Sequence, residues 1–490
     1  MRSAIFLGLG GLVALSACAP GYQSAGVPLP ATFREVSDSA PTTVTAVTAV
    51  TAVIAATDSA ATAVAPVVQA AAAGTGDYWG QLGDTTLSRL IGEVARANLD
   101  VRSARARVNA ARSAKTRSAL DLTPGAIVSG GYARQRLSTA SFPGASGVFP
   151  DQNVWDAGVT ASWDLDVFGQ VRQTVQAQGA LVGVAQEELR DVQVSLTAEL
   201  ARTYFELRGA QEQLAVARQN AENQRRTFEV ARVRAEAGRG SAFDTERAQA
   251  QLSITLASIP AHEAQVAAAQ YRIGVLVGRP PAAVAAELER PGQIPALPDT
   301  VSIGTPEAVV RGRPDVAAAE RLAAAQGALV GAAKASYLPR ITIGGSAGYA
   351  APEFRAVGDQ GTFRYAVGPV ISWPLLNLGR VKAEVDVAAA REDAARLRYR
   401  GVVLAAMEDL EVTLSQYGAA RRRLEQLQEA SRASEHAAEL ALLRFTEGAT
   451  DLLQVLDAQR TQLEAQDRLA QARIDAATAY AALYRAVGGR

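Results

Sequence analysis

The sequence predicts a mainly α-helical protein with four β-strands in each chain, built from two copies of one structural unit. Three observations carry this prediction. Matching residues recur at a fixed offset, two segments (169–237 and 379–447) contain no proline, and several short segments alternate between apolar and small or polar side chains. Proline-free helical periodicity favours long helices, whereas alternation with a period of two favours strands.

The internal repeat rests on an offset of 210 residues that is kept over more than a hundred positions. The matching pairs include Trp163 with Trp373, Arg234 with Arg444, Gly238 with Gly448, and Gly278 with Gly488. Self-similarity at a fixed offset indicates a duplicated structural unit. We therefore expect a first repeat at 78–278, an equatorial connector at 279–312 and a second repeat at 313–490.

Each repeat is expected to contain a helix, a β-hairpin, a very long helix and a return helix. These elements are predicted at 85–120, 125–165, 169–237 and 241–277, and again at 314–336, 340–374, 379–447 and 451–487. Apolar residues at heptad-like spacing, such as Val403, Leu410 and Tyr417, indicate coiled-coil packing of the long helices. Pro260 lies inside the first return helix, where it should kink or break that helix.

The strand segments carry the pattern of a transmembrane β-barrel. Apolar and small or polar residues alternate from Trp155 to Trp163, and segments 341–349 and 363–373 do the same. Strands of about ten residues with one apolar face and aromatic ends suit such a barrel, although a soluble β-sandwich alternates equally well. Open strand edges are not tolerated in lipid, so four strands per chain must be pooled among subunits. A dimer would give a filled barrel, and a trimer would leave room for a channel.

The N-terminus predicts an exported, lipid-anchored protein. Residues 1–17 carry Arg2 and an apolar stretch too short to span a bilayer, as a signal peptide does. The following Leu15-Ser-Ala-Cys18 resembles a lipobox, so Cys18, the only cysteine, should carry a covalent diacylglycerol and a further acyl chain. The alternative is an ordinary secretory signal that is cut after Ala17. Residues 18–77 should then form an extended linker rich in Ala, Thr, Val and Pro.

Composition argues against an enzyme and against a nucleic-acid-binding protein. The formal net charge is zero, so no electrostatic attraction to nucleic acid is expected. The two histidines, His262 and His436, stand alone at positions that do not match between the repeats. Single helical histidines are usually surface residues, so we expect no catalytic site, no metal and no cofactor other than the lipid.

Several segments resemble one known family. They are Asn98-Leu-Asp-Val101, Trp163-Asp-Leu-Asp-Val-Phe-Gly-Gln-Val-Arg172, Ile259-Pro-Ala261, Arg313-Pro-Asp-Val316 and Leu456-Asp-Ala-Gln-Arg460. Together they are similar to TolC-type outer membrane efflux proteins, in the NodT-like lipoprotein branch. The resemblance covers nearly the whole chain after residue 18. The chain departs from the pattern in its linker, because residues 42–76 are longer and more repetitive than is usual in this family.

The resemblance implies a homotrimer in which a twelve-stranded transmembrane β-barrel is continued by a periplasmic α-helical barrel. It implies a place in the outer membrane of a Gram-negative bacterium, in contact with its lipid, with a large periplasmic portion. The expected partners are a periplasmic membrane-fusion adaptor and an inner-membrane pump of the resistance-nodulation-division (RND) type. The expected function is passive export of small molecules. A duct for type I protein secretion and a coiled-coil structural lipoprotein without a lumen are the alternatives.

The turns that follow the two long helices are the candidate functional sites. Gly238 and Gly448 should end these helices in the left-handed conformation. Ser241 with Asp244, and Asp451 with Gln454, have the spacing of capping boxes. The resemblance implies that these six residues and Gly240 form the tip at which the adaptor docks. It also implies a periplasmic gate nearby, for which the charged candidates are Arg234, Arg444, Glu447 and Asp451.

Overall fold

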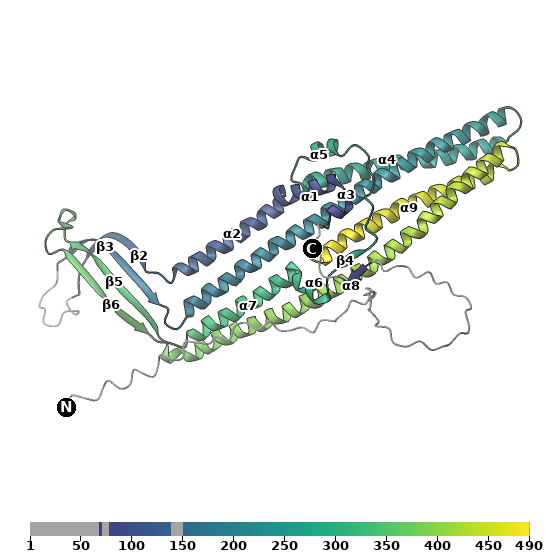
Figure 1. Cartoon of the computed structure of the whole chain (residues 1–490). Helices are drawn as coiled ribbons and strands as arrows, with labels where there is room; N and C mark the ends of the chain where they lie inside the picture. The colour runs from purple at the N-terminus through teal and green to yellow at the C-terminus, as the bar shows by residue number, and fades with distance from the viewer. Residues whose placement is uncertain (1–67, 71–77, 139–149, 490) are drawn as a thin grey trace, which may run out of the picture. The chain divides into compact units, whose positions relative to one another are not determined.

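The computed structural model describes residues 68–70, 78–138 and 150–489 (Figure 1). The described residues divide into two compact units. The sheet unit comprises the described parts of 106–186 and 318–400, and the helical unit comprises the remainder. The predicted signal peptide, Cys18 and most of the predicted linker lie outside the described residues.

The sheet unit contains one antiparallel sheet of four strands. The strands are β2 (Gly125–Gln135), β3 (Gln152–Leu165), β5 (Arg340–Ala351) and β6 (Phe363–Ser372). Their order is β2-β3-β5-β6, so β2 and β6 form the two edges. A mainly helical chain with a four-stranded antiparallel sheet is therefore confirmed. The two predicted hairpins join into a single sheet because β3 and β5 pair along their length, from Trp155 with Ala351 to Leu165 with Ile341.

The two faces of this sheet differ in chemistry because successive side chains point to opposite sides. One face carries polar groups, including the hydrogen bond from Thr342 to Asp164. The other face carries large apolar side chains that stay exposed in the single chain, among them Tyr365 and Val367 at 74% and 75% exposure. Two tryptophans fasten the strand ends to the ends of two helices, α2 (Leu99–Leu120) and α7 (Pro314–Ala335). Trp163 donates to the Leu122 carbonyl (2.9 Å), and Trp373 donates to the Tyr337 carbonyl (3.0 Å).

The helices account for most of the described residues. Four of them contribute residues to both units: α2 (Leu99–Leu120), α3 (Gln170–Glu236), α7 (Pro314–Ala335) and α8 (Leu378–Thr446). The others lie in the helical unit: α1 (Thr85–Ala97), α4 (Ala242–Leu276), α5 (Pro281–Glu287), α6 (Pro306–Gly312) and α9 (Leu452–Ala486). Among the described residues, none of the helices has both the length and the apolar character needed to cross a membrane.

Two details differ from the sequence-based expectation. The expected helix at 85–120 is interrupted at Asn98, whose side chain caps α2 by accepting from the amides of Asp100 (2.8 Å) and Val101 (3.2 Å). The same side chain donates to the Leu276 carbonyl (2.8 Å), which fixes the interruption against α4. Of the expected kink or break at Pro260, the break is wrong, because α4 runs through this residue as one helix. A proline removes only one N–H donor, and α4 continues for many residues on both sides.

The predicted linker ends on the helical unit. Residues Val68–Ala70 form β1, which pairs in parallel with β4 (Val301–Ile303) inside the predicted connector. Tyr78 then enters the core against α9. Its hydroxyl donates to the Tyr480 carbonyl (2.9 Å), the Tyr480 hydroxyl donates to the Tyr78 carbonyl (3.1 Å), and the two rings stack at 4.5 Å. These reciprocal bonds satisfy both buried phenols and attach the segment before α1 to α9.

Buried phenols make the helical unit sensitive to alkaline pH. Burial raises the pKa of Tyr78 and Tyr480 above the ordinary value of 10.0. Burial and the hydrogen bond to Asp84 raise the pKa of Tyr204 to about 12. A raised folded-state pKa favours the neutral phenol in the folded protein. The stability that each phenol contributes is therefore complete below pH 10 and is lost as the pH rises through the folded-state pKa.

We expect Tyr480→Phe to cost about 1 kcal/mol of unfolding free energy at neutral pH, because one buried hydrogen bond is removed. The unfolding temperature of this variant should then fall less steeply between pH 9 and about pH 11 than that of the parent protein. Thermal unfolding followed by circular dichroism measures both effects. The exposed Tyr271→Phe is the control and should keep the parent slope. Equal slopes for Tyr480→Phe and the parent would contradict this explanation.

Close backbone contact between β3 and β5 requires glycine at 348. A Cβ atom there would lie 2.5 Å from the Ala157 carbonyl oxygen and 2.6 Å from the Gly158 Cα. Gly348→Ala should therefore lower stability by about 1–3 kcal/mol through overpacking. Gly344→Ala, in the same strand, is the matched control because its Cβ would meet nothing within 4 Å. Thermal unfolding of both variants checks the difference, and equal midpoints would show that β3 and β5 separate without cost.

Candidate functional site

The two long helices end in turns of the same construction. The first turn (residues 237–241) joins α3 to α4, and the second (447–451) joins α8 to α9. Gly238 and Gly448 adopt the predicted left-handed conformation, with φ of 71° and 76°. Two bonds from a backbone amide to a backbone carbonyl close each turn. In the first turn they run from Arg239 to Arg234 (2.8 Å) and from Gly238 to Ala235 (3.0 Å). In the second turn they run from Ala449 to Arg444 (2.8 Å) and from Gly448 to Phe445 (3.0 Å). This bond pattern satisfies carbonyls that a helix end leaves free.

The caps of the return helices differ between the turns. Ser241 accepts from the Asp244 amide (3.2 Å) and Asp244 accepts from the Ser241 amide (3.3 Å), so the first capping box is complete. Asp451 accepts from the Gln454 amide (3.2 Å). The predicted return bond, from the Asp451 amide to the Gln454 side-chain oxygen, is not formed, and this oxygen accepts from the Thr450 hydroxyl instead. Gly240 packs tightly, since a Cβ atom there would lie 3.2 Å from the Ala235 nitrogen.

Arg234 joins the two turns. Its Nη2 atom donates to the carbonyls of Phe445 (3.0 Å) and Thr446 (3.2 Å), which are the last residues of α8. Its guanidinium carbon also lies 4.2 Å from the centre of the Phe445 ring. A cation placed over an aromatic ring and against helix C-terminal carbonyls is stabilised by both. We call this arrangement of Arg234, Phe445 and Thr446 the Arg234 clamp.

The other predicted gate residues are not paired with Arg234 in the described part of the chain. Arg444, Glu447 and Asp451 are exposed, and within the described part of the chain no ion pair links them to one another or to Arg234. Arg232 pairs with Glu229 (2.7 Å) and Glu236 (3.0 Å) of its own helix. Sequence reasoning selected Arg234 by its charge but missed Phe445. Comparing the two halves of the sequence does not point to Phe445, because the residue 210 positions earlier is Ala235.

A line of buried and partly buried polar contacts connects α3 with α9 farther from the turns. Gln459 donates to the Thr227 hydroxyl (2.8 Å), and Asn220 donates to the Gln466 side-chain oxygen (2.8 Å). Next along this line Gln213 donates to Asp467 (3.2 Å). These three residues of α3 are seven positions apart, a spacing that could have revealed them in the sequence. Paired polar groups inside a helix interface fix its register, because sliding would leave them unsatisfied.

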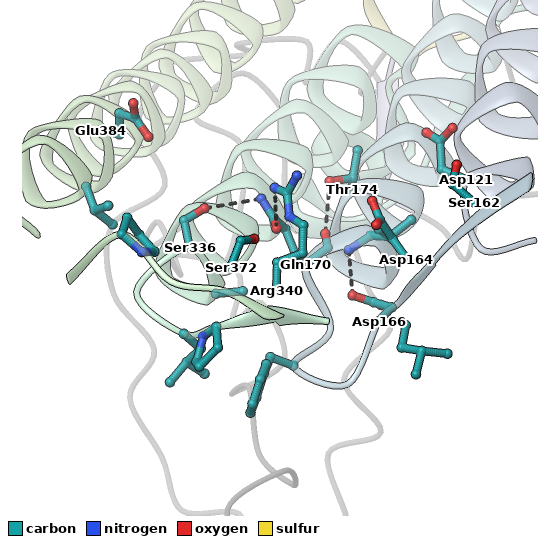
Figure 2. A pocket seen from close by; sticks show the side chains of 18 of the residues that line it. Asp121, Ser162, Asp164, Asp166, Gln170, Thr174, Ser336, Arg340, Ser372 and Glu384 are labelled. Atoms are coloured by element: carbon teal, nitrogen blue, oxygen red, sulfur yellow. Dashed lines mark hydrogen bonds between the residues drawn. The ribbon is translucent and has the colours of Figure 1, made fainter. Parts of the chain in front are cut away.

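The sheet unit holds a polar cavity of about 750 Å³ where the strands meet the helices (Figure 2). Asp166 accepts from the amides of Val171 and Arg172 (both 2.9 Å), so it caps the start of α3. Gln170 donates to Ser336 (3.2 Å) and accepts from Arg340 (3.2 Å), as Figure 2 shows. These bonds fasten the start of α3 to the end of α7 and the start of β5. They satisfy one another and do not form a nucleophile–base pair.

No metal site accompanies this cavity or the turns. Among the residues that the structure describes, no group of three or more His, Cys, Asp or Glu side chains could hold a metal ion. In the cavity and in the turns alike, side-chain and backbone hydrogen bonds hold helix ends at defined positions. These contacts can position chain segments and hold them together.

Comparison with known proteins identifies close relatives in sequence and in structure. The family model described as outer membrane efflux protein matches residues 90–279 and 306–489. Nodulation protein T of Rhizobium leguminosarum bv. viciae is 28% identical over 405 residues, which cover 81% of this chain and 80% of that protein. Outer membrane protein OprJ of Pseudomonas aeruginosa is 29% identical over 422 residues, covering 86% and 88%. The solved structure of the outer-membrane channel OprN is 36% identical with a TM-score of 0.78, covering 84% of this chain and 92% of that one.

The clamp leads to a prediction about local opening. Arg234→Ala removes two charge-assisted hydrogen bonds and a ring contact, each worth on the order of 1 kcal/mol. Amide hydrogen exchange around residues 444–450 should therefore quicken about tenfold or more, while exchange in the middle of α8 stays unchanged. Mass-spectrometric exchange measures this difference. Arg239→Ala, an exposed arginine of the first turn, is the control. Equal exchange in both variants would show that the second turn does not depend on Arg234.

Proposed function

This chain belongs to the outer membrane efflux protein family, and from that membership we propose that it is the exit duct of a tripartite efflux system. In this proposal small molecules leave the cell passively through the chain's assembly. A periplasmic adaptor and an inner-membrane pump of the RND type deliver them. The match to both halves of the chain, and the similarity to the outer-membrane channel OprN, support this function over that of an enzyme.

The sheet is the observation that carries the proposal. Its edge strands β2 and β6 have no strand partner on their outer sides within the described chain, and one face is apolar and exposed. Unpaired strand edges are not tolerated in a membrane. We infer that β6 of one copy pairs with β2 of the next, and that three copies of four strands close a twelve-stranded barrel. Its apolar face contacts lipid, and its polar face lines the lumen.

The helices would continue this lumen through the periplasm. The long helices α3 and α8 contain 67 and 69 residues, and the return helices α4 and α9 contain 35 each. This correspondence supports the internal duplication that the sequence predicts. At about 1.5 Å per residue, a long helix reaches roughly 100 Å. Three copies would contribute six long helices and six return helices to a closed tunnel of twelve helices.

The two turns would form the periplasmic tip. In this proposal the adaptor docks on the exposed surface of the two turns. The docking residues are Gly238, Gly240, Ser241, Asp244, Gly448, Asp451 and Gln454. The Arg234 clamp keeps the two turns together in the closed state, and docking selects an arrangement in which they separate. Arg444, Glu447 and Asp451 would act at the entrance through their exposed charge, as they are not bonded to the clamp.

Lipid at Cys18 would add a second anchor to the barrel. Two acyl chains hold a protein stably at a membrane, whereas one is marginal. The strand β1 and the Tyr78–Tyr480 pair fix the far end of the linker to the helical unit. The linker would then tie the lipid anchor to the periplasmic portion, in the outer membrane of a Gram-negative bacterium.

Conductance in planar lipid bilayers tests the duct directly. Purified full-length protein should insert as a trimer and give a small, closed-state conductance. Arg234→Ala should raise the mean conductance severalfold, because the clamp no longer holds the turns together, and Arg239→Ala should leave it unchanged. Insertion without any conductance in the parent protein and in Arg234→Ala would exclude a continuous lumen.

Loss of the gene in its host should lower tolerance to a broad panel of small toxic compounds, and re-expression should restore it. If tolerance is unchanged and the host no longer secretes one particular protein, the result would instead support a duct for protein secretion.

A further inference from the structure

Toward the outer end of strand β2, one face carries first an apolar, then an aromatic and then a basic side chain. β2 and β3 pair in the register Tyr132 with Trp155 and Arg134 with Asn153. Because side chains alternate, Val128, Tyr132 and Arg134 lie on one face of the strand, which is the apolar face of the sheet. All three are exposed in the single chain. This end of the sheet is the one that has no helix attached.

Aromatic rings mark where the apolar face ends. Tyr132 packs on Trp155 with ring centres 4.6 Å apart, and Trp155 contacts Phe354 at 5.2 Å. Trp155 and Trp163 lie on the same face, eight positions apart, which is about 26 Å along a strand. The apolar band of a membrane barrel is about 25 Å tall. The Tyr132–Trp155–Phe354 cluster therefore lies where the hydrocarbon would end and the lipid head groups would begin.

Two arginines stand directly beyond this cluster. Arg134 and Arg136 have 67% and 60% of their side chains exposed, and both contact one carboxylate, that of Asp151. The Arg134 Nη2 atom lies 3.2 Å from Oδ2, and the Arg136 Nε atom lies 2.6 Å from Oδ1. Two guanidinium groups on one carboxylate leave a net positive charge. They also leave several N–H donors directed at solvent, because an arginine has more donors than this carboxylate can accept.

We propose that Arg134 and Arg136 bind the phosphate of a phosphorylated glycolipid in the outer leaflet, with its acyl chains against the Tyr132–Trp155–Phe354 cluster. This inference rests on the proposed barrel, which places the cluster at the outer surface of the membrane. A phosphate monoester carries a charge of about −1.5 to −2 at neutral pH and fits the planar donor fork of arginine. Asp151 holds both guanidinium groups in place before the lipid arrives, so less side-chain freedom is lost on binding.

The charge of the head group decides between two sources of phosphate. A phospholipid presents a phosphodiester with a single charge, whereas a lipid A-type glycolipid presents phosphate monoesters. Two adjacent arginines with one shared counter-ion favour the more highly charged group. The proposal therefore commits to the glycolipid, and phosphatidylglycerol becomes the comparison in the test.

Native mass spectrometry of the full-length protein in detergent measures the binding, with diphosphoryl lipid A as the probe. Arg134→Gln combined with Arg136→Gln should weaken lipid A binding about tenfold or more, because charge-assisted hydrogen bonds are removed. The matched control is Arg225→Gln with Arg226→Gln. These helical arginines also share one carboxylate, that of Glu222, so the change of charge is the same. The control pair should keep the parent affinity, and phosphatidylglycerol should bind more weakly than lipid A to the parent protein and to the control pair.

Three results would overturn the proposal: an unchanged affinity in the Arg134/Arg136 variant, an equal loss in the control pair, or phosphatidylglycerol bound as tightly as lipid A by the parent protein. Arg134→Gln alone should give an intermediate affinity, which guards against a folding defect in the double variant. Conductance of the same preparations separates this inference from the proposed duct. Lipid A binding can be lost while conductance remains, and absent conductance in the parent would count against the duct alone.

Discussion

Unsatisfied strand edges are the constraint on which the rest of this molecule depends. β2 and β6 each present a row of backbone N–H and C=O groups on the side that no strand of the described chain covers. Each such group would cost several kcal/mol in hydrocarbon. The same strands expose large apolar side chains that water disfavours. Water and lipid are therefore both unfavourable to the single sheet. Pairing with further copies, as in the proposed barrel, would remove both costs, and membrane insertion would then be coupled to assembly.

The joints at the strand ends show how the sheet and the adjoining helix ends are held together. The indoles of Trp163 and Trp373 donate to the carbonyls of Leu122 and Tyr337, in the short segments after α2 and α7. Asp166 caps α3 directly after β3. These contacts are local and nearly all polar, and they occur where a strand must turn into a helix. Within the sheet unit, the direction of each helix start therefore follows from the strand before it.

Sequence reasoning succeeded where helix termination or residue spacing alone sets the local structure. It failed where a further side-chain contact or the surrounding helix also determines that structure. Left-handed Gly238 and Gly448 follow from helix termination, and the Ser241 cap follows from spacing alone. The interruption at Asn98 depends on its bond to Leu276, far away in the chain. The partner of Gln454 depends on a neighbouring hydroxyl that competes for its side chain. We did not predict that α4 continues through Pro260, because the expectation considered the effect of the proline and not the length of helix on either side of it.

The two turns share their backbone hydrogen bonds but not their side-chain contacts. The hydrogen bonds that close each turn are local, so both copies keep them. Arg234 and Arg444 occupy matching positions, yet only Arg234 faces a ring and two helix-end carbonyls of the other turn. Its partner Phe445 is buried among apolar residues of both hairpins. The second turn is thus held partly by a side chain of the first, while the first has its own complete capping box. A partner that displaces Arg234 would loosen the second turn and leave the first intact, which makes the two hairpins unequal in any opening movement.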